Sequence, residues 1–357
     1  MAITLNQHRA GVTQTLIAVF SDDKTPKQGL ASLFPTTTTE SKYVSIEVER
    51  SLQLVAVDVQ RCTDPERNVF GNFTEKIFMP PYFNESFDYT SCERYDVTFG
   101  RGNAPTKIDL QFLIRDAKAK LLVLKNKILR AIEIMRAQIV TTGVVTLRNG
   151  DSIDFKRKAA SMPVLTGTAQ WDTATATPLA DLEAGMDFLR DEGLSSGTSV
   201  NAIFGKAAYN NFVSNEQVKE QAEWKNIKRV EINMPQFDNV RGMVFQGQIA
   251  TTDYIVNLWT YNEKYVSPSD NTTLKNYIDT NDVILVADDF VGKTAFAGVP
   301  AIFEKDGQEY IAQMEGEFYV NDVIDQIKKS WLFMISSAPL PIPVSIDRIY
   351  TLRTVTP

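Results

Sequence analysis

A single long amphipathic helix constrains the fold of this chain more than any other feature. Apolar residues step by three and four along one stripe, at Ile114, Ala117, Leu121, Leu124, Ile128, Ile132, Met135 and Ile139. Pro105 stands before the stripe and Gly143 after it, as expected at the two ends of a helix. The pattern predicts a helix over residues 106–140, about 50 Å long at a rise of 1.5 Å per residue.

The same helix is rich in charge. It has eight Lys or Arg residues (107, 115, 118, 120, 125, 127, 130, 136) and three acids (109, 116, 133), an excess of five positive charges. The whole chain nevertheless has a formal net charge of −7, which disfavours nucleic-acid binding as its main role. We therefore interpret the basic residues as a solvated face rather than a nucleic-acid contact.

Two extended segments precede the helix. Residues 42–60 alternate apolar and polar side chains as a long strand, and an aromatic-rich stretch, interrupted at Pro80 and Pro81, follows a turn-rich tip. Together they predict an elongated hairpin-like loop. Because an isolated two-stranded ribbon is marginally stable in water, this one must lie against its own chain or a neighbouring subunit. Residues 1–34 have too few apolar residues for a core of their own and are interpreted as an arm.

A mixed α/β stretch follows the helix. The turn "RNGD" predicts a small hairpin within 143–158. We expect helices near 178–193 and over 206–221, and strands in "SVNAIFG", "MVFQGQIATTDYIVNLWTYN" and "DVILVAD". These elements run to about residue 290.

The C-terminal segment "WLFMISSAPLPIPVSIDRIY" has three prolines spaced two apart. We expect a strand over 331–338, and an extended turn in which Pro339, Pro341 and Pro343 cannot accept a strand partner. A last strand over 344–355 would follow.

No catalytic constellation is evident. His8 is the only histidine, and it lies in the expected arm. Cys62 and Cys92 are the only cysteines, which favours a reducing compartment and leaves open whether the two pair. Zinc sites built from His and Cys are thereby excluded. No apolar run is long enough to span a bilayer, and the N-terminus has no signal-peptide pattern.

The segment "ADDFVGKT", residues 287–294, partly matches a phosphate-binding loop. Asp288 and Asp289 would place negative charge where phosphates should lie, and Gly292 alone supplies backbone freedom. Gly298 and Pro300 would also break the helix whose N-terminus holds phosphate. A turn between two strands is the better interpretation.

Four segments in order resemble one family. They are "LFPTTTTESKYVSIE", "LTGTAQWDTATATPLADLEA", "NDVILVADDFVGKTAFAG" and "FMISSAPLPIPVSIDRIYTLRTV". With the long helix between the first two, they resemble a tailed-phage major capsid protein of the lambda-like branch of the Hong Kong 97-type fold.

The resemblance implies an α+β capsid fold. Its parts would be an N-terminal arm (1–41), an extended β loop (42–105), a peripheral domain (106–170 and 300–357) with the spine helix 106–140, and an axial α/β domain (171–299). It implies no catalytic, cofactor-binding or metal-binding residues, and no Lys/Asn pair is assigned to a covalent cross-link.

The implied function is self-assembly into an icosahedral shell that encloses phage DNA. Implied partners are other copies of the chain in hexamers and pentamers, a separate scaffold protein, a portal, a decoration protein, and double-stranded DNA bound without sequence specificity; no membrane is implied. The location would be the virion capsid, assembled in the bacterial host cytoplasm. The alternatives are an encapsulin-like compartment or gene-transfer particle of the same fold, a P-loop-like NTPase, and a tail structural protein.

Overall fold

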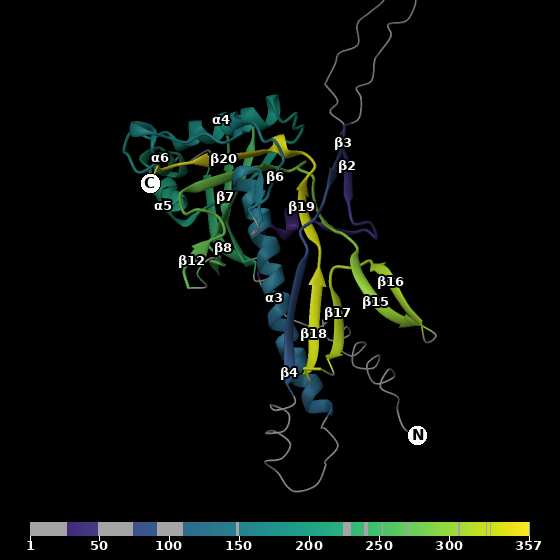
Figure 1. The fold of residues 1–357 in the computed structure, drawn as a ribbon. Coiled ribbons are helices and arrows are strands. Elements are labelled where there is room, and N and C mark those ends of the chain that lie inside the picture. Colours follow the sequence, from purple (N-terminus) through teal and green to yellow (C-terminus); the bar gives the residue numbers. More distant parts are fainter. Residues whose placement is uncertain are drawn as a thin grey trace, which may run out of the picture.

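A computed structural model describes residues 27–48, 74–90, 110–147, 150–223, 230–238, 242–251, 253–268, 270, 272–305, 308–325, 327–328 and 330–356. The central element is the helix α3, Leu110–Thr142, which runs through the length of the molecule (Figure 1). The predicted stripe is confirmed where its side chains are described: Ala117, Leu121, Ile128, Ile132, Met135 and Ile139 are all buried.

Gly143 ends this helix. Its N–H donates to the carbonyls of Gln138 (3.2 Å) and Ile139 (2.9 Å), and its φ of +72° lies in the left-handed region that favours glycine. A Cβ at this position would stand 2.6 Å from the Cβ of Arg157. The turn therefore requires glycine on two grounds, backbone conformation and space.

A six-stranded mixed sheet forms the second half of the molecule. Its strand order is β20 (Ile349–Arg353), β13 (Asp282–Ala287), β7 (Ser199–Phe204), β10 (Ile255–Tyr261), β9 (Met243–Ala250) and β8 (Val230–Asp238). Helices gather on one side of it: α4 (Pro178–Asp191), α5 (Lys206–Ser214) and α6 (Glu216–Glu223) (Figure 1). One apolar cluster joins this sheet to the helices, and a second joins its other side to α3. The predicted α/β stretch is confirmed.

Two local details refine that prediction. The helix expected over 206–221 is split at Asn215, whose backbone is extended and whose side-chain Oδ1 accepts the Gln217 N–H at 3.0 Å, so asparagine caps the start of α6. Before α4, Trp171 is 2% exposed and its indole N–H donates to Asp181 at 2.8 Å. This contact fixes the loop that leads into the helix.

The chain end returns to the six-stranded sheet. The last strand, expected over 344–355, is β20, and a short 3-10 helix (η4, Ile346–Arg348) precedes it. It pairs antiparallel with β13. Part of the segment 300–357, which we expected in the peripheral domain, therefore completes a sheet built mainly from residues 199–287.

The proline segment does accept a strand partner, so that part of the prediction was wrong. After β18 (Ser330–Ser337), residues Pro339–Pro343 form the strand β19. It is the edge of a three-stranded sheet in the order β1 (Thr36–Thr38), β14 (Gly292–Phe296), β19. All five residues of β19 are buried.

The spacing of the prolines explains why this pairing is possible. Thr294 donates its N–H towards β1, to Pro35 O, whereas Ala297 donates to Ala338 O beside β19. Backbone groups alternate direction along a strand, so the β14 residues that bond β19 face Leu340 and Ile342. The prolines face the positions that do not hydrogen-bond. A proline at every second residue of an edge strand therefore costs no ladder bond.

Replacing Pro341 with alanine removes no ladder bond. The free energy of unfolding should fall by about 0.4–1 kcal/mol through the greater freedom of the unfolded chain, and by about 1–2 kcal/mol more because two ring carbons leave a buried position. A suitable contrast is Lys293→Pro, because Lys293 is exposed but its N–H faces β19. This variant should lose more stability, since it removes a ladder bond from a central strand. Urea denaturation of the unassembled subunit measures both. Equal losses of unfolding free energy in the two variants would contradict the assignment of Lys293 as a position that hydrogen-bonds β19 and of Pro341 as one that does not.

The base of the predicted extended loop is confirmed as a ribbon. The strands β2 (Val44–Val48) and β3 (Thr74–Phe78) pair antiparallel and project from the body (Figure 1). After Pro80 and Pro81, β4 (Phe83–Thr90) pairs along β18, which also pairs with β17 (Tyr319–Asp325). Part of the surface that the loop needs therefore comes from its own C-terminal segment. Residues 49–73 and 91–105 of the loop lie outside the described residues.

Three further hairpins and three 3-10 helices, η1 (Gly29–Leu33), η2 (Ala159–Ser161) and η3 (Gly167–Ala169), are also described. The hairpin predicted around "RNGD" is confirmed as β5 and β6. The bounds are β5 (Val144–Thr146) with β6 (Ser152–Asp154), β11 (Lys264–Val266) with β12 (Leu274–Asn276), and β15 (Val299–Lys305) with β16 (Gln308–Met314).

Candidate assembly surfaces

A buried polar cluster holds the N-terminal described segment against the rest of the chain. Glu133 of α3 is fully buried, and its Oε1 accepts the backbone N–H of Leu30 (2.8 Å) and the hydroxyl of Tyr261 (3.0 Å). Burial raises the pKa of the Glu133 carboxyl. The carboxylate thus ties the segment before β1 to α3 and to β10 at a single point.

Arg136, one turn later, extends this cluster. It is 2% exposed and bonds Glu133 (3.2 Å), the side-chain oxygen of Gln28 (2.8 Å) and Thr294 Oγ1 (3.0 Å). Burial lowers the pKa of its guanidinium. For Arg136, and for Lys125, which is 8% exposed, the prediction that the basic residues form a solvated helix face was wrong. The second half of α3 is covered on nearly every side. A sequence signal existed: Glu133 and Arg136 directly follow the stripe residues Ile132 and Met135.

The earlier half of the helix is closer to the prediction. Lys127 is exposed and pairs with Glu85 of β4 at 2.7 Å, and Lys120 pairs with Asp116 at 3.3 Å while lying over the ring of Tyr89. The Tyr89 hydroxyl donates to Asp116, which lowers the pKa of that carboxyl. Part of the basic face therefore serves to hold β4 beside the helix.

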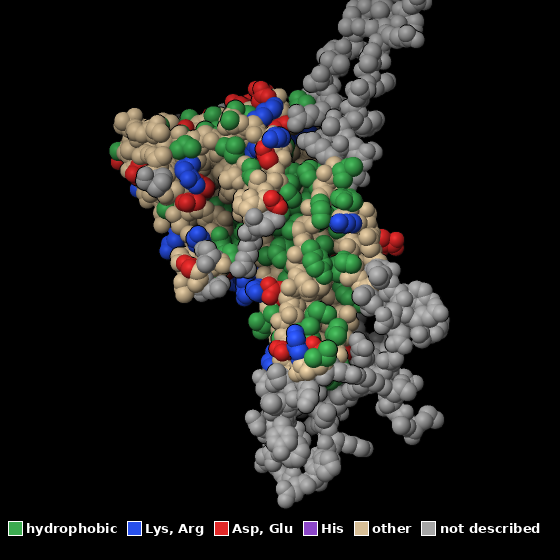
Figure 2. Space-filling view, viewed as in Figure 1, with side chains coloured by type: hydrophobic (Ala, Val, Ile, Leu, Met, Phe, Trp, Pro, Cys, Tyr) green, Lys and Arg blue, Asp and Glu red, His purple; other side chains and the backbone are tan. Residues whose placement is uncertain are grey.

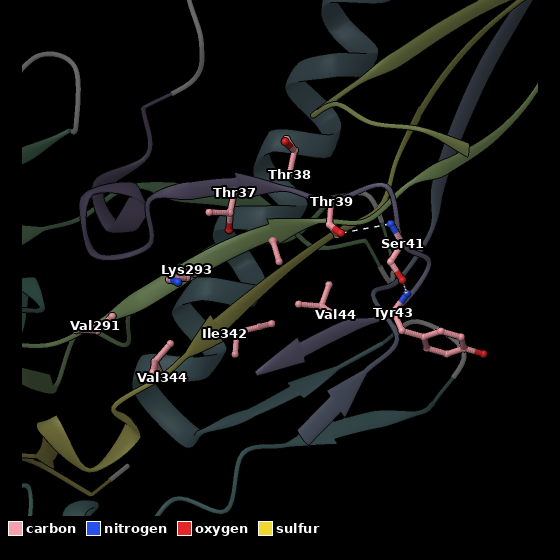
Figure 3. Close-up of a pocket in the computed structure, with 11 residues that line it drawn as sticks. Thr37, Thr38, Thr39, Ser41, Tyr43, Val44, Val291, Lys293, Ile342 and Val344 are labelled. Atoms are coloured by element: carbon pink, nitrogen blue, oxygen red, sulfur yellow. Dashed lines mark hydrogen bonds between the residues drawn. The ribbon is translucent and has the colours of Figure 1, made fainter. Parts of the chain in front are cut away.

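An open groove of about 470 Å³ lies where the extended loop leaves the body (Figure 3). Its walls are hydroxyl and aliphatic side chains of β1, β14, β19 and the start of β2, with Lys293 as the charged residue among them. Ser41 donates its N–H to Thr39 Oγ1 (3.3 Å), and Tyr43 donates its N–H to Ser41 Oγ (3.1 Å). The groove has no set of acids, bases or nucleophiles placed for chemistry.

The segment "ADDFVGKT" forms the predicted turn between two strands, β13 and β14. Asp288 accepts the Asn201 side-chain N–H at 2.9 Å, and Asp289 accepts the Ser195 hydroxyl at 2.8 Å. A Cβ on Gly292 would lie 2.6 Å from the Leu33 carbonyl oxygen, so packing against the chain accounts for that glycine. β14 continues as a strand where a phosphate loop would need a helix.

Apolar side chains are exposed on several projecting parts of the molecule. At the base of the ribbon they are Tyr43, Ile77, Met79 and Tyr82; on the hairpin β11–β12, Val266 and Leu274; on and beside β17, Val323 and Ile327. Figure 2 shows hydrophobic side chains gathered over the region of β18 and β19. Contiguous exposed apolar surface is typical of sites that contact another macromolecule.

Other chemistry finds little support in the described part of the chain. Within it, no three or more His, Cys, Asp or Glu residues are grouped as a metal site would require. None of its helices combines the length and apolar character needed to cross a membrane. His8, Cys62 and Cys92 lie outside the described residues.

Comparison with known proteins bears on the whole chain. The sequence model of the family phage major capsid protein E matches residues 12–354. No curated protein matches the sequence. Among solved structures, the chain is similar to a protein described as a prophage capsid protein of E. coli CFT073 (17% identity, TM-score 0.63, covering 99% of this chain and 100% of that one). A phage-related protein from Bordetella bronchiseptica RB50 is also similar (14% identity, TM-score 0.53, 96% of each chain).

Proposed function

The chain belongs to the phage major capsid protein E family, and from this premise we propose which of its surfaces serve assembly. The protein is a major capsid protein that forms an icosahedral shell, and its α+β fold is of the Hong Kong 97 type. We infer that the extended loop, residues 42–105, lies over a neighbouring subunit. The observation that carries this proposal is the projecting β2–β3 ribbon, whose base exposes Tyr43, Ile77, Met79 and Tyr82.

One apolar cluster supports the proposed axial domain over 171–299, because it lies between the six-stranded sheet and its helices. The other surrounds α3 and the β18–β19 segment of the proposed peripheral domain (106–170 and 300–357), and it also includes Ile203, Tyr261 and Ile284 of the sheet. The two proposed domains therefore share this second cluster. With β20 paired to β13, residues 349–353 are better assigned to the axial domain. The arm, residues 1–41, would reach an adjacent subunit from its anchor at Leu30.

The proposed partners follow from a shell role. They are copies of the chain in hexamers and pentamers, a separate scaffold protein, a portal and a decoration protein. The net charge of −7 supports enclosing double-stranded DNA without holding its backbone. The virion capsid is the location that the family implies; assembly in the host cytoplasm and membership of the lambda-like branch are proposals.

We propose that the protein has no enzymatic activity. The family and the fold are those of structural proteins. The turn at Asp288 and Asp289 is followed by β14 rather than by a helix N-terminus for a phosphate, and the guanidinium of Arg348 beside it is paired with Asp289 at 3.3 Å. Fluorescent ATP titration tests the NTPase alternative. Binding that disappears in Lys293→Ala would support that alternative, and no measurable binding by the wild-type protein removes it.

Expression with its neighbouring genes is expected to give closed particles tens of nanometres across, visible by negative-stain electron microscopy. Association of the copies is favoured by a free energy of roughly 25 cal/mol for each Å² of exposed apolar surface that a neighbour covers. Tubes or open rings would favour the tail-protein alternative, and persistent monomers beside the cognate scaffold would contradict a shell role. Cargo enzymes inside the particles, in place of DNA, would favour an encapsulin-like compartment.

A further inference from the structure

The outer face of the sheet β17–β18–β4 has a row of apolar side chains beside a carboxylate. Val323, Leu332 and Asp88 form one row across the three strands, since Leu332 pairs with both of the others. Side chains alternate faces along a strand, so the neighbouring row of Asp322, Phe333 and Phe87 faces the core, where Phe333 is fully buried. The outer row therefore presents two adjoining apolar side chains followed by a carboxylate.

This row lies in an open depression of about 540 Å³. The turn beside it holds Ile327, which is 95% exposed, and Asp325, whose carboxylate accepts the N–H groups of Ile327 (2.9 Å) and Lys328 (3.0 Å). Within the described residues, Asp88 is exposed and has no ion pair. The described residues that line the depression include the carboxylates of Asp88 and Asp325 and the ammonium group of Lys328. Asp88 is therefore the carboxylate there that a cation from another surface could pair with.

The hairpin β11–β12 offers the matching surface. Val266 pairs with Leu274 and Lys264 with Asn276, which places Val266, Leu274 and Lys264 on one face. Val266 is 49% and Leu274 63% exposed. Lys264 is exposed and has no ion pair among the described residues. The hairpin thus presents two adjoining apolar side chains followed by an ammonium group.

The other face of the hairpin is already occupied. Tyr265, on that face, packs against the ring of Tyr277 with centroids 5.0 Å apart. The loop that joins the two strands is held by Asp270, which accepts the N–H groups of Thr272 and Thr273 at 3.2 Å each. The hairpin is therefore fixed on one side and available on the other.

We propose that the β11–β12 hairpin of one copy docks on the β17–β18–β4 face of a second copy, with Lys264 beside Asp88. The two surfaces match in apolar content and are opposite in charge, and they occupy different parts of the chain. A contact between different patches is heterologous, so it can repeat from copy to copy and close into a ring. The proposal rests on the shell function, and it names a contact that the shell would use.

The contact is small. Stable pairs of proteins bury at least about 1,000 Å² in total, and one hairpin with one depression falls short of that. We therefore expect no dimer in solution from this contact alone. Its effect should appear when many copies assemble and each contact adds to the others.

Charge reversal tests the pairing. Lys264→Glu and Asp88→Lys are each expected to reduce the yield of closed particles about tenfold, because like charges then meet in the contact. The double variant should recover most of the wild-type yield. Lys275→Glu, on the other face of the hairpin, and Glu183→Lys, exposed on α4, are matched controls that should leave the yield unchanged.

Disulfide trapping tests the contact directly. In a background with Cys62→Ser and Cys92→Ser, Leu274→Cys combined with Val323→Cys should give a ladder of covalent multimers in assembled particles under oxidising conditions. Each single cysteine variant should give none.

The outcomes separate this proposal from the shell function. Wild-type particles with unaffected single reversals, or with no ladder in the double cysteine variant, would overturn the contact and leave the shell function standing. Loss of particles in Asp88→Lys that Lys264→Glu does not rescue would mean that another partner covers the sheet, which also overturns it. Absence of wild-type particles would instead count against the shell function itself.

Discussion

Replacing Arg136 with alanine is expected to lower the free energy of unfolding by about 3–5 kcal/mol, because it leaves the fully buried Glu133 carboxylate without its counter-charge. The same change removes the hydrogen bonds to Gln28 and Thr294. Guanidinium denaturation of the unassembled subunit, followed by tryptophan fluorescence, measures the loss. Arg130→Ala is the control: Arg130 is exposed on the same helix, so its replacement should change stability by less than about 0.5 kcal/mol.

A double variant distinguishes an unpaired charge from a loss of packing. Replacing Glu133 with leucine and Arg136 with methionine removes both charges while keeping most of the volume, and such exchanges of buried ion pairs are often neutral or stabilising. We expect the double variant to be more stable than Arg136→Ala. The Leu30 N–H would lose its acceptor, however, so the amide hydrogens of the 3-10 turn Gly29–Leu33 should exchange faster with solvent. A double variant less stable than the single one would contradict this account.

Replacing Phe333 with alanine should also cost about 3–5 kcal/mol, the range for removing a large buried aromatic side chain. Phe333 is fully buried and its ring is stacked on that of Phe87, with the ring centroids 5.3 Å apart. Its centroid lies 5.0 Å from that of Trp331 and 5.9 Å from that of Tyr89. Phe333 joins the extended-loop strand β4 to the C-terminal strand β18. The cavity therefore weakens the attachment of the loop as well as the core.

The neighbouring residue of the same strand provides the control. Met334 is half-buried on the outer face of β18, so Met334→Ala should cost much less than Phe333→Ala in the same denaturation experiment. We also expect Phe333→Ala to increase protease cleavage within β4 before global unfolding. Equal costs at the two positions would show that the inner and outer faces of this sheet are assigned wrongly.

Features that repeat within a short stretch of sequence were predicted correctly. The stripe of α3 follows from residues three and four apart, because each turn of a helix returns the chain to the same side. The β5–β6 hairpin was predicted from one Asn-Gly turn. The turn at Asp288 and Asp289 was predicted because their negative charge is incompatible with a phosphate site. The closing segment also carried one of the four marks of the capsid family, now shown by the match over residues 12–354.

Pairings between distant residues were not predictable in the same way. The prolines of β19 looked like a break, and their role became clear only beside β14, where the bonding positions fall on Leu340 and Ile342. Arg136 was predicted to be solvated because its partner Thr294 lies more than a hundred residues away along the chain, as Leu30 does from Glu133. The sequence did not show whether the second extended segment lies against its own chain or against a neighbouring subunit. In the structure, β4 of that segment pairs with β18 of the same chain.

The sequence by itself determined the long helix, the local turns, the α/β stretch and the resemblance to a capsid family, since each depends on residues close together or on recurring segments. Only the tertiary structure decided which strand the prolines pair with, which charges are buried, and that residues 349–353 complete the sheet of residues 199–287. The physical reason is that hydrogen-bond pairing and burial depend on the neighbour across the sheet or helix, and folding can bring any part of the chain to that place.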